Sequence, residues 1–259
     1  MDLESLKYEL AGLPFSNIFF YLETDSTNQR AIEWLQEGKA GNALFTADSQ
    51  TAGRGRLGRK WHTEPGASLA FSLALHPTKD EKDKLSLFPL LGAVAAAEAA
   101  EKVCRSPVEV KWPNDVLLNG KKTCGILAET VWQGEELAGL VLGIGINLLP
   151  TSVPPAQELN FPATCIQVHA TQTIDRLFFL RSVITHLFNY RNTLTQDSFI
   201  QRYRDLLAFK NQEVMLETME GKKFCGILDG IDNGGCLLLK MDESQTKSFP
   251  IGDLRLRPA

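Results

Sequence analysis

The feature that most constrains the fold is a series of short strand patterns separated by tight turns in the middle of the chain. The patterns cover Val108–Trp112, Asp115–Leu118, Lys122–Val131 and Leu137–Asn147. The Asn119-Gly120 pair between the second and third is a strong hairpin signal, because both residues tolerate the positive φ angles of a type I′ turn. A QGEE turn leads into the fourth strand. Strands joined in this way pair with their sequence neighbours, so the pattern predicts an antiparallel meander.

Helical patterns lie on both sides of the meander. Ser26 and Gln29 form a capping-box pattern that predicts the start of a helix. The alanine-rich stretch Phe88–Cys104 predicts a buried helix, and residues 174–207 predict two more. Further strands are expected over residues 17–22, 43–47 and 68–75. The fold class is therefore α+β, with a mixed or antiparallel sheet and helices packed mainly on one face.

The pattern of apolar and polar residues changes after Lys210. Short alternating runs follow, separated by EGKK, DNGG and DESQ turns, which is typical of a small antiparallel barrel or sandwich. We place a boundary near Ala208. The chain is expected to form a large domain over residues 1–208 and a small SH3-like β-barrel over residues 209–259.

Composition excludes several classes of protein. The formal net charge of −4 does not suggest a dedicated nucleic-acid binder, which usually has a basic face. The five cysteines include no CxxC pair and the four histidines show no metal-ligand spacing, so neither a zinc site nor a disulfide framework is indicated. No apolar run approaches the ~20 residues of a membrane span, and the acidic start of the chain lacks a signal-peptide pattern. We expect a cytoplasmic protein.

A glycine- and arginine-rich loop over residues 53–58 matches two nucleotide-binding patterns only in part. Gly53-Arg54-Gly55-Arg56-Leu57-Gly58 has the spacing G-x-G-x-x-G, but the dinucleotide fingerprint requires a helix after its last glycine. A loop and a strand pattern follow here. Arg59-Lys60 also replaces the Lys-Ser/Thr of a P-loop. Two interpretations remain: a solvated flexible loop, or an anion site in which glycines allow close backbone approach and arginines donate in pairs.

The ordered combination of four motifs resembles the biotin–protein ligase family. The motifs are GRGRLGRKW at 53–61, KWPNDV at 111–116, KTCGIL at 122–127 and GIGIN at 143–147. Ser26-Thr27-Asn28 and Gln50 also stand where that family has them, and the resemblance extends from Ile18 to the C-terminus. Residues 1–17 are too few for the winged helix-turn-helix of the repressor subfamily, so the chain resembles the monofunctional type that lacks it.

This resemblance implies an ATP-dependent ligase that forms biotinyl-5′-AMP and transfers biotin to a lysine of a biotin carboxyl carrier protein. Mg²⁺ is expected to accompany ATP near Asp115, without a direct metal motif. The protein is expected to act as a monomer or homodimer with no nucleic-acid or membrane partner. Loops 53–61 and 151–163 are candidate lids that exclude water from the adenylate.

The resemblance also implies a role for each matching residue. The residues expected to bind biotin are Ser26, Thr27, Asn28, Gln50, Gly53, Arg54, Gly55, Arg56, Trp61, Lys122 and Gly125. Those expected to bind ATP or the adenylate are Arg56, Trp61, Asn114, Asp115, Lys122, Gly143, Gly145, Asn147 and Arg257. The catalytic residues are expected to be Lys122, Arg54, Arg56 and Asp115, because two anions must be brought together against their repulsion.

Simpler interpretations exist for individual residues. Ser26 is also explained as a helix cap, Asp115 as a turn residue and Arg257 as a solvated terminal arginine. Leu57 departs from the family pattern, in which many relatives have another arginine. The alternative functions are a lipoate or octanoate ligase or transferase of related fold, and a non-catalytic biotin-binding protein.

Overall fold

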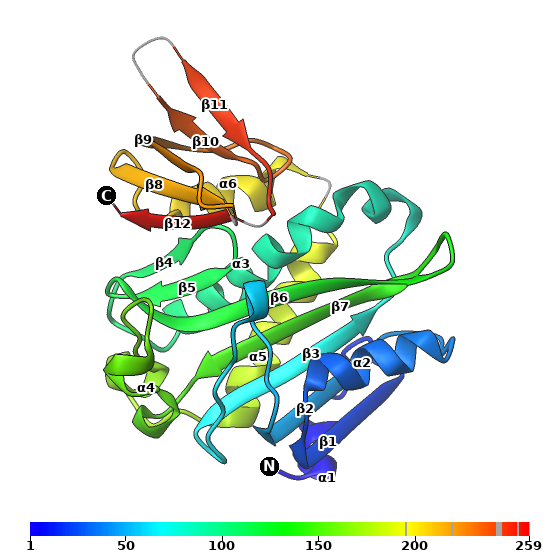
Figure 1. Ribbon diagram of the computed structural model, residues 1–259. Helices are drawn as coiled ribbons and strands as arrows, with labels where there is room; N and C mark the ends of the chain where they lie inside the picture. Colours follow the sequence, from blue (N-terminus) through cyan, green and yellow to red (C-terminus); the bar gives the residue numbers. More distant parts are fainter. Residues whose placement is uncertain (195, 219, 242–244, 253, 259) are drawn as a thin grey trace.

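The computed structural model of the chain describes residues 1–194, 196–218, 220–241, 245–252 and 254–258. It contains two β-sheets, with the smaller one lying beyond one end of the larger (Figure 1). No helix within these ranges is both long and apolar enough to cross a lipid bilayer.

The larger sheet has seven strands in the order β1-β2-β3-β7-β6-β5-β4. Its strands are β1 (Asn17–Thr24), β2 (Ala43–Gln50), β3 (Ser68–Leu75), β4 (Val108–Lys111), β5 (Asp115–Leu118), β6 (Lys121–Gln133) and β7 (Glu136–Asn147). Only β1 and β2 pair in parallel; the other neighbours are antiparallel. The predicted meander β4 to β7 is confirmed. Asn119 and Gly120 have φ angles of 49° and 72°, as a type I′ turn requires.

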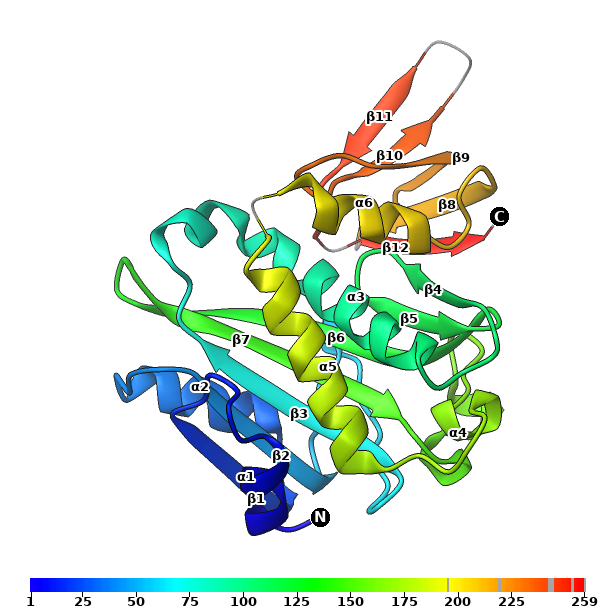
Figure 2. The same cartoon turned by 180° about the vertical axis from the view of Figure 1, so that it is seen from behind.

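Helices cover the two faces of this sheet unequally. The helices are α1 (Leu3–Glu9), α2 (Thr27–Gln36), α3 (Phe88–Glu101), α4 (Ile166–His169), α5 (Arg176–Arg191) and α6 (Asp197–Leu206). The long helices α3 and α5 lie together on one face (Figure 2), and α2 lies on the other (Figure 1). Almost every side chain of α3 is buried, because small alanines allow it to pack closely against both the sheet and α5. The α+β prediction is confirmed, although α1 was not predicted.

A buried ion pair connects α5 to the segment that precedes α3. Arg191 Nε and one of its terminal nitrogens lie 2.7 and 2.8 Å from the two oxygens of Glu81. The same guanidinium donates to the carbonyl of His76 at 2.9 Å. Glu81 is 6% exposed, so this pair is largely removed from water.

The smaller sheet has five antiparallel strands in the order β11-β10-β9-β8-β12. The strands are β8 (Glu213–Thr218), β9 (Lys223–Ile231), β10 (Leu237–Lys240), β11 (Thr246–Phe249) and β12 (Leu254–Pro258). Within the described ranges, β11 and β12 do not pair, so the closure expected of a barrel is not present and the sheet is open. β12 is an edge strand of this sheet and pairs with β8; it lies on the side of the smaller sheet that faces the larger one (Figure 1).

Both sheets share one apolar core. A continuous cluster of buried side chains joins Trp112 of the larger sheet region to Leu216 and Leu239 of the smaller one. Trp112 Nε1 also donates to the carbonyl of Gly235 at 3.0 Å. A division of the chain into domains 1–208 and 209–259 therefore remains a prediction, and the contact across the proposed boundary is extensive.

Candidate active site

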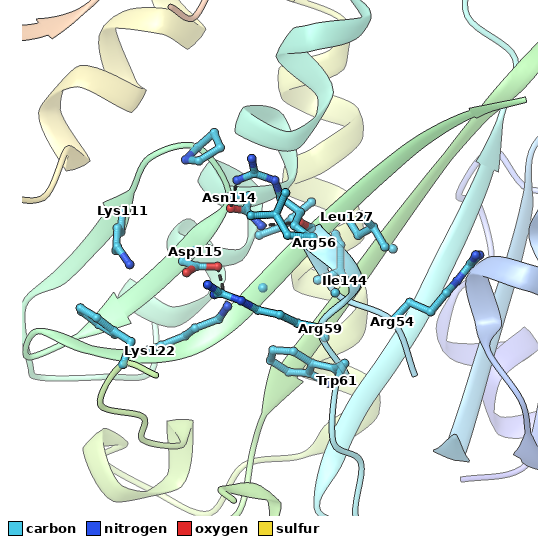
Figure 3. Close-up of a pocket in the computed structure, with 18 of the residues that line it drawn as sticks. Arg54, Arg56, Arg59, Trp61, Lys111, Asn114, Asp115, Lys122, Leu127 and Ile144 are labelled. Carbon is cyan, nitrogen blue, oxygen red and sulfur yellow. Dashed lines mark hydrogen bonds and ion pairs between the residues drawn. The ribbon is translucent and has the colours of Figure 1, made fainter. Parts of the chain in front are cut away.

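A cavity of about 550 Å³ opens on the sheet face that carries α2 and the glycine- and arginine-rich loop. Its lining comes from distant parts of the sequence: the start of α2, the end of β2, the loop, the KWPND segment, the middle of β6 and β7, residues 160–162, and β12. Four motifs that are separated along the chain therefore meet in one place. Figure 3 shows the charged part of this cavity.

One end of the cavity carries uncharged hydrogen-bonding groups at the start of α2. Ser26 is the N-cap residue, but its side chain makes no capping hydrogen bond, so the predicted capping box is wrong. Asp25 accepts a hydrogen bond from the Ser26 amide instead, at 2.6 Å. A hydrogen-bonded pair with Arg30 lowers the pKa of Asp25 to about 2, which keeps this acceptor ionised. The Ser26 side chain lines the cavity.

Thr27 and Gln50 are held together at this uncharged end. The Thr27 amide lies 2.8 Å from Gln50 Oε1, and the Thr27 hydroxyl lies 3.1 Å from the same oxygen. The backbone of Gln50 is also fixed, because its backbone amide donates to Thr63 Oγ1 at 2.8 Å. Both residues line the cavity, so the structure brings these predicted residues together.

A second set of contacts extends from Thr27 to the loop. The Ser72 hydroxyl lies 2.7 Å from Thr27 Oγ1 and 2.6 Å from Asn28 Oδ1. Asn28 Nδ2 donates to Glu129 Oε2 at 2.6 Å, and Arg54 lies 3.2 Å from the same oxygen. Both ends of the Asn28 side chain are thus bonded to protein. Neither Ser72 nor Glu129 was predicted as a site residue. The sequence signal that could have indicated them is a polar residue within an otherwise apolar strand pattern.

The floor of the cavity consists of three glycines on β6 and β7. A Cβ atom at Gly143 would overlap Asn28 Oδ1, and one at Gly145 would overlap the indole of Trp61. At Gly125 it would lie 3.0 Å from Trp61 Cζ3. The indole therefore lies directly on the backbone of two strands, where any side chain would displace it. Its Nε1 is buried and has no hydrogen-bond partner among the described residues.

The opposite end of the cavity is strongly cationic. Lys122 Nζ lies 2.6 Å from Asp115 Oδ1 and 5.7 Å from the centre of the Trp61 ring. Lys111 lies over the Phe161 ring at 4.1 Å, and burial lowers the pKa of Lys111 to about 8. Arg59 extends toward Asp115 and Lys122 (Figure 3), and burial lowers the pKa of Arg59 as well.

Arg56 connects the loop to two other segments. It donates to Asn114 Oδ1 at 3.0 Å and to the carbonyl of Gly252. Asn114 is itself fixed on β6, because its Nδ2 donates to the carbonyl of Ile126 at 2.7 Å. The loop is thereby attached to both the KWPND segment and the connection between β11 and β12.

Arg54 lies elsewhere than its predicted catalytic role requires. Its side chain points away from Lys122, Asp115 and Arg59 (Figure 3) and contacts Glu129 instead. In this arrangement Arg54 belongs to the uncharged end of the cavity and contributes no charge beside Asp115.

Two other predicted residues lie outside the cavity lining. Asn147 is 4% exposed and donates to the carbonyl of Thr164 at 3.1 Å, so it supports the segment after residue 162. Gly53 accepts from the Trp61 amide at 2.9 Å, which closes the base of the loop. Among the residues not predicted, Lys111 and Arg59 lie within the quoted motifs, and Arg255 lies two positions from Arg257 on β12. All three line the cavity together with Arg257.

Comparison with known proteins agrees with this arrangement. A sequence profile of the biotin/lipoate A/B protein ligase family matches residues 20–147. The chain is 33% identical over 261 residues to the bifunctional ligase/repressor BirA of Bacillus subtilis, covering 94% of this chain and 74% of that protein. It is 32% identical over 222 residues to the biotin–[acetyl-CoA-carboxylase] ligase of Paracoccus denitrificans, covering 84% and 91% of the two chains.

The fold agrees with a solved structure over nearly the whole chain. The biotin protein ligase from Aquifex aeolicus in complex with biotin and ATP superimposes with a TM-score of 0.80 at 31% identity, covering 95% of this chain and all of that one. This chain therefore belongs to the biotin/lipoate A/B protein ligase family. Within the family, its similarity over most of its length is to the biotin protein ligases, which confirms the resemblance seen in its motifs.

Proposed function

We propose that this chain is a biotin protein ligase, which activates biotin with ATP and transfers it to a lysine of a biotin carboxyl carrier protein. The observation that supports this most directly is the polarity of the cavity. Amide and hydroxyl groups line one end, where Arg54 is paired with Glu129, and the other lysines and arginines lie toward the opposite end. Biotin has the same polarity, with an uncharged cyclic urea at one end and a carboxylate at the other.

The uncharged end would hold the urea ring. Ser26, Thr27 and Gln50 supply hydroxyl and amide groups that match its carbonyl oxygen and two N–H groups. The glycines allow Trp61 and Asn28 to lie close to β6 and β7, and the bicyclic ring would pack against these two side chains. A lipoyl group has no such donors and acceptors in its dithiolane ring, and buried polar groups left unpaired are costly. The site therefore favours biotin over lipoate.

The cationic end would hold the biotin carboxylate and the nucleotide phosphates. The carboxylate attacks the α-phosphorus in line and displaces pyrophosphate, so the barrier comes chiefly from repulsion between anions. Lys122 stands at this point with its ammonium group already fixed, and a fixed charge needs no reorganisation during the reaction. Lys111, Arg59 and Arg257 surround it, and Arg56 would retain the adenylate under the loop.

The residues present fit a magnesium ion that ATP brings with it. Mg²⁺ in nucleotide sites takes one or two carboxylates together with phosphate oxygens and water. Asp115 is the one carboxylate among the described residues that line the cavity, and the described chain has no cluster of three potential metal ligands. Asp115 would hold the ion, which neutralises phosphate charge when it is bound.

The second step needs an attacking amine and a leaving AMP. The amine of the acceptor lysine attacks the acyl carbon of biotinyl-5′-AMP, the acyl–phosphate bond breaks, and AMP departs. Asp115 is our proposed acceptor for the proton that the amine loses. Arg56 and Trp61 keep water away from the mixed anhydride until the acceptor arrives.

Three further properties are part of this proposal. We infer that the enzyme works without nucleic acid, because its net charge is −4. We infer a cytoplasmic location, because all five cysteines are free thiols. We infer a monomer or homodimer. Gel-shift assays with operator-like DNA and sedimentation with and without biotin and ATP test the first and last of these inferences.

The test of the activity is biotin-dependent exchange of pyrophosphate into ATP, followed by transfer of labelled biotin to a purified carrier domain. Exchange is expected with biotin and not with lipoate or octanoate. Exchange with lipoate instead of biotin would contradict the assignment. Binding of biotin without any exchange would indicate a non-catalytic binding protein.

A further inference from the structure

The uncharged end of the cavity is organised by a carboxylate that faces it from β6. Glu129 Oε2 accepts from Asn28 Nδ2 at 2.6 Å and from Arg54 at 3.2 Å. One oxygen atom therefore contacts both the start of α2 and the glycine- and arginine-rich loop. The side chain of Glu129 is 28% exposed and that of Arg54 is 38% exposed, so the pair lies at the rim of the cavity, while Asn28 is buried behind it.

We propose that Glu129 is a positioning residue that fixes the direction of the hydrogen bonds offered to the urea ring of biotin. This inference rests on the proposed function. An ionised carboxylate accepts hydrogen bonds and cannot donate them. The amide nitrogen of Asn28 must therefore face Glu129, and its oxygen must face Ser72.

The direction is then passed along the chain of contacts. Asn28 Oδ1 can only accept, so the single hydroxyl hydrogen of Ser72 is directed to it at 2.6 Å. Ser72 has no second hydrogen for Thr27, which lies 2.7 Å away. The Thr27 hydroxyl must therefore direct its own hydrogen toward Ser72 or Gln50, and its lone pairs remain available to a ligand N–H.

Gln50 is oriented separately, by the backbone amide of Thr27. Its Oε1 accepts from the Thr27 amide at 2.8 Å, so its Nε2 group is the part available as a donor. The cavity then offers one acceptor, Thr27, and one donor, Gln50, at neighbouring positions. This is the complement of a cyclic urea, which presents N–H beside C=O. Glu129 contacts neither Thr27 nor Gln50, and it acts on Thr27 through Asn28 and Ser72.

A neutral amide at position 129 would weaken the directional constraint, because glutamine can donate as well as accept. Arg54 can only donate and still favours the glutamine oxygen at this contact, but an orientation in which Asn28 is rotated by 180° and every bond up to Thr27 is reversed becomes available. We expect Glu129→Gln to weaken biotin binding about 10- to 100-fold, because hydrogen bonds to charged groups are stronger than neutral ones and the reversed network mismatches the ligand. The Michaelis constant for ATP and the exchange rate at saturating biotin should change by less than about threefold.

A double substitution distinguishes an effect on the direction of the hydrogen bonds from an effect on side-chain packing. Asn28→Asp places two carboxylates in contact and should abolish measurable biotin binding. In the double variant Asn28→Asp/Glu129→Gln, the glutamine amide can donate to the new carboxylate, which still accepts from Ser72. The original direction is restored, and biotin affinity should recover to within about tenfold of the wild-type value.

The measurements are calorimetric titration with biotin, Michaelis constants for both substrates and melting temperature, with Glu136→Gln on β7 as the control. Glu136 is exposed and lies outside the cavity lining, so its variant should match the wild type. Equal losses of biotin and ATP affinity in Glu129→Gln, or no recovery in a folded double variant, would overturn the proposal. Failure of the wild type to exchange pyrophosphate with biotin would instead overturn the proposed function.

Discussion

Lys122 Nζ and Asp115 Oδ1 lie 2.6 Å apart at the cationic end of the cavity, on neighbouring strands β6 and β5. Their side chains are 25% and 14% exposed, so the pair is partly shielded from water and open on one side to the cavity. Strand pairing sets this distance, since Asp115 pairs with Gly125 and Lys122 with Leu117 across the ladder. The ammonium group is therefore held by the sheet before any substrate binds.

This relationship distinguishes two lysines with the same local pattern, K-x-C-G-I-L. Lys223 begins β9, is exposed, and lies outside the cavity lining. We expect Lys122→Ala to lower the rate of adenylate formation about 10²- to 10³-fold, the usual cost of losing one preorganised electrostatic donor. Lys223→Ala should change it by a factor of a few at most. Single-turnover formation of biotinyl-5′-AMP measures both. A larger loss for the Lys223 variant would show that the active site lies at the smaller sheet and not at the larger one.

The lowered pKa of Lys111 predicts how nucleotide binding depends on pH. With a pKa of about 8, Lys111 loses its positive charge as the pH rises from 7 to 9. ATP is attracted to the protonated form, so the Michaelis constant for ATP should rise several-fold over this range. Lys111→Met should bind ATP more weakly at pH 7 and show a flatter profile. Lys240→Met, at an exposed lysine paired with Asp229, is the control. Parallel profiles for Lys111→Met and wild type would refute this role.

The glycine at position 143 has a testable steric role. Gly143→Ala would push its methyl group into Asn28 Oδ1, and Asn28 is held by Ser72 and Glu129, so it cannot move away easily. Biotin affinity should fall at least tenfold. Gly230→Ala on β9 is a matched control, because no atom lies within 4 Å of the added methyl group. Equilibrium binding of labelled biotin is the measurement, and normal affinity in a folded Gly143→Ala protein would count against the contact.

The buried pair of Arg191 and Glu81 should contribute strongly to stability. Removing one partner leaves an uncompensated buried charge, so Glu81→Ala should lower the free energy of unfolding by about 3–5 kcal/mol. The net effect of Arg191 is to lower the pKa of Glu81 despite its burial. The contribution is therefore present above the unfolded pKa and is lost as the pH falls below about 4.5.

Urea denaturation at pH 7 and at pH 4 measures this contribution. The difference between wild type and Glu81→Ala should shrink at the lower pH. Glu4→Ala removes the exposed pair with Lys7 and should leave the denaturation midpoint unchanged. A midpoint for Glu81→Ala equal to that of the Glu4 variant would show that the pair contributes nothing measurable.

Much of the architecture could be predicted from local patterns. The hairpin at Asn119-Gly120 required positive φ angles that few residue pairs tolerate, and the strands of the meander alternate or run apolar as buried strands do. The start of α2 was placed correctly for a wrong reason. Ser26 is its N-cap, but the Ser26 side chain makes no capping hydrogen bond and lines the cavity instead.

The site was predictable where function is concentrated in motifs, and less so where it depends on spatial neighbours. Lys122, Asp115 and Trp61 meet as the motifs implied. The pairing of Arg54 with Glu129 joins residues 75 positions apart in sequence, and no spacing rule indicates it. Asn147 follows the apolar run of β7 and was predicted to face the nucleotide, yet it lies at the end of the strand, where the Thr164 carbonyl needs a donor.

The three glycines of the cavity floor also limit what can be changed in this enzyme by protein engineering. A pocket is usually enlarged for a bulkier substrate analogue by trimming side chains, but Gly125, Gly143 and Gly145 have none left to remove. Extra volume therefore cannot be gained at these three positions. A variant that accepts a larger biotin analogue must gain its space at the walls, by shortening Trp61 or by changing the residues at the start of α2. Substitutions at Gly143 and Gly145 should instead displace Asn28 and Trp61 and lower activity.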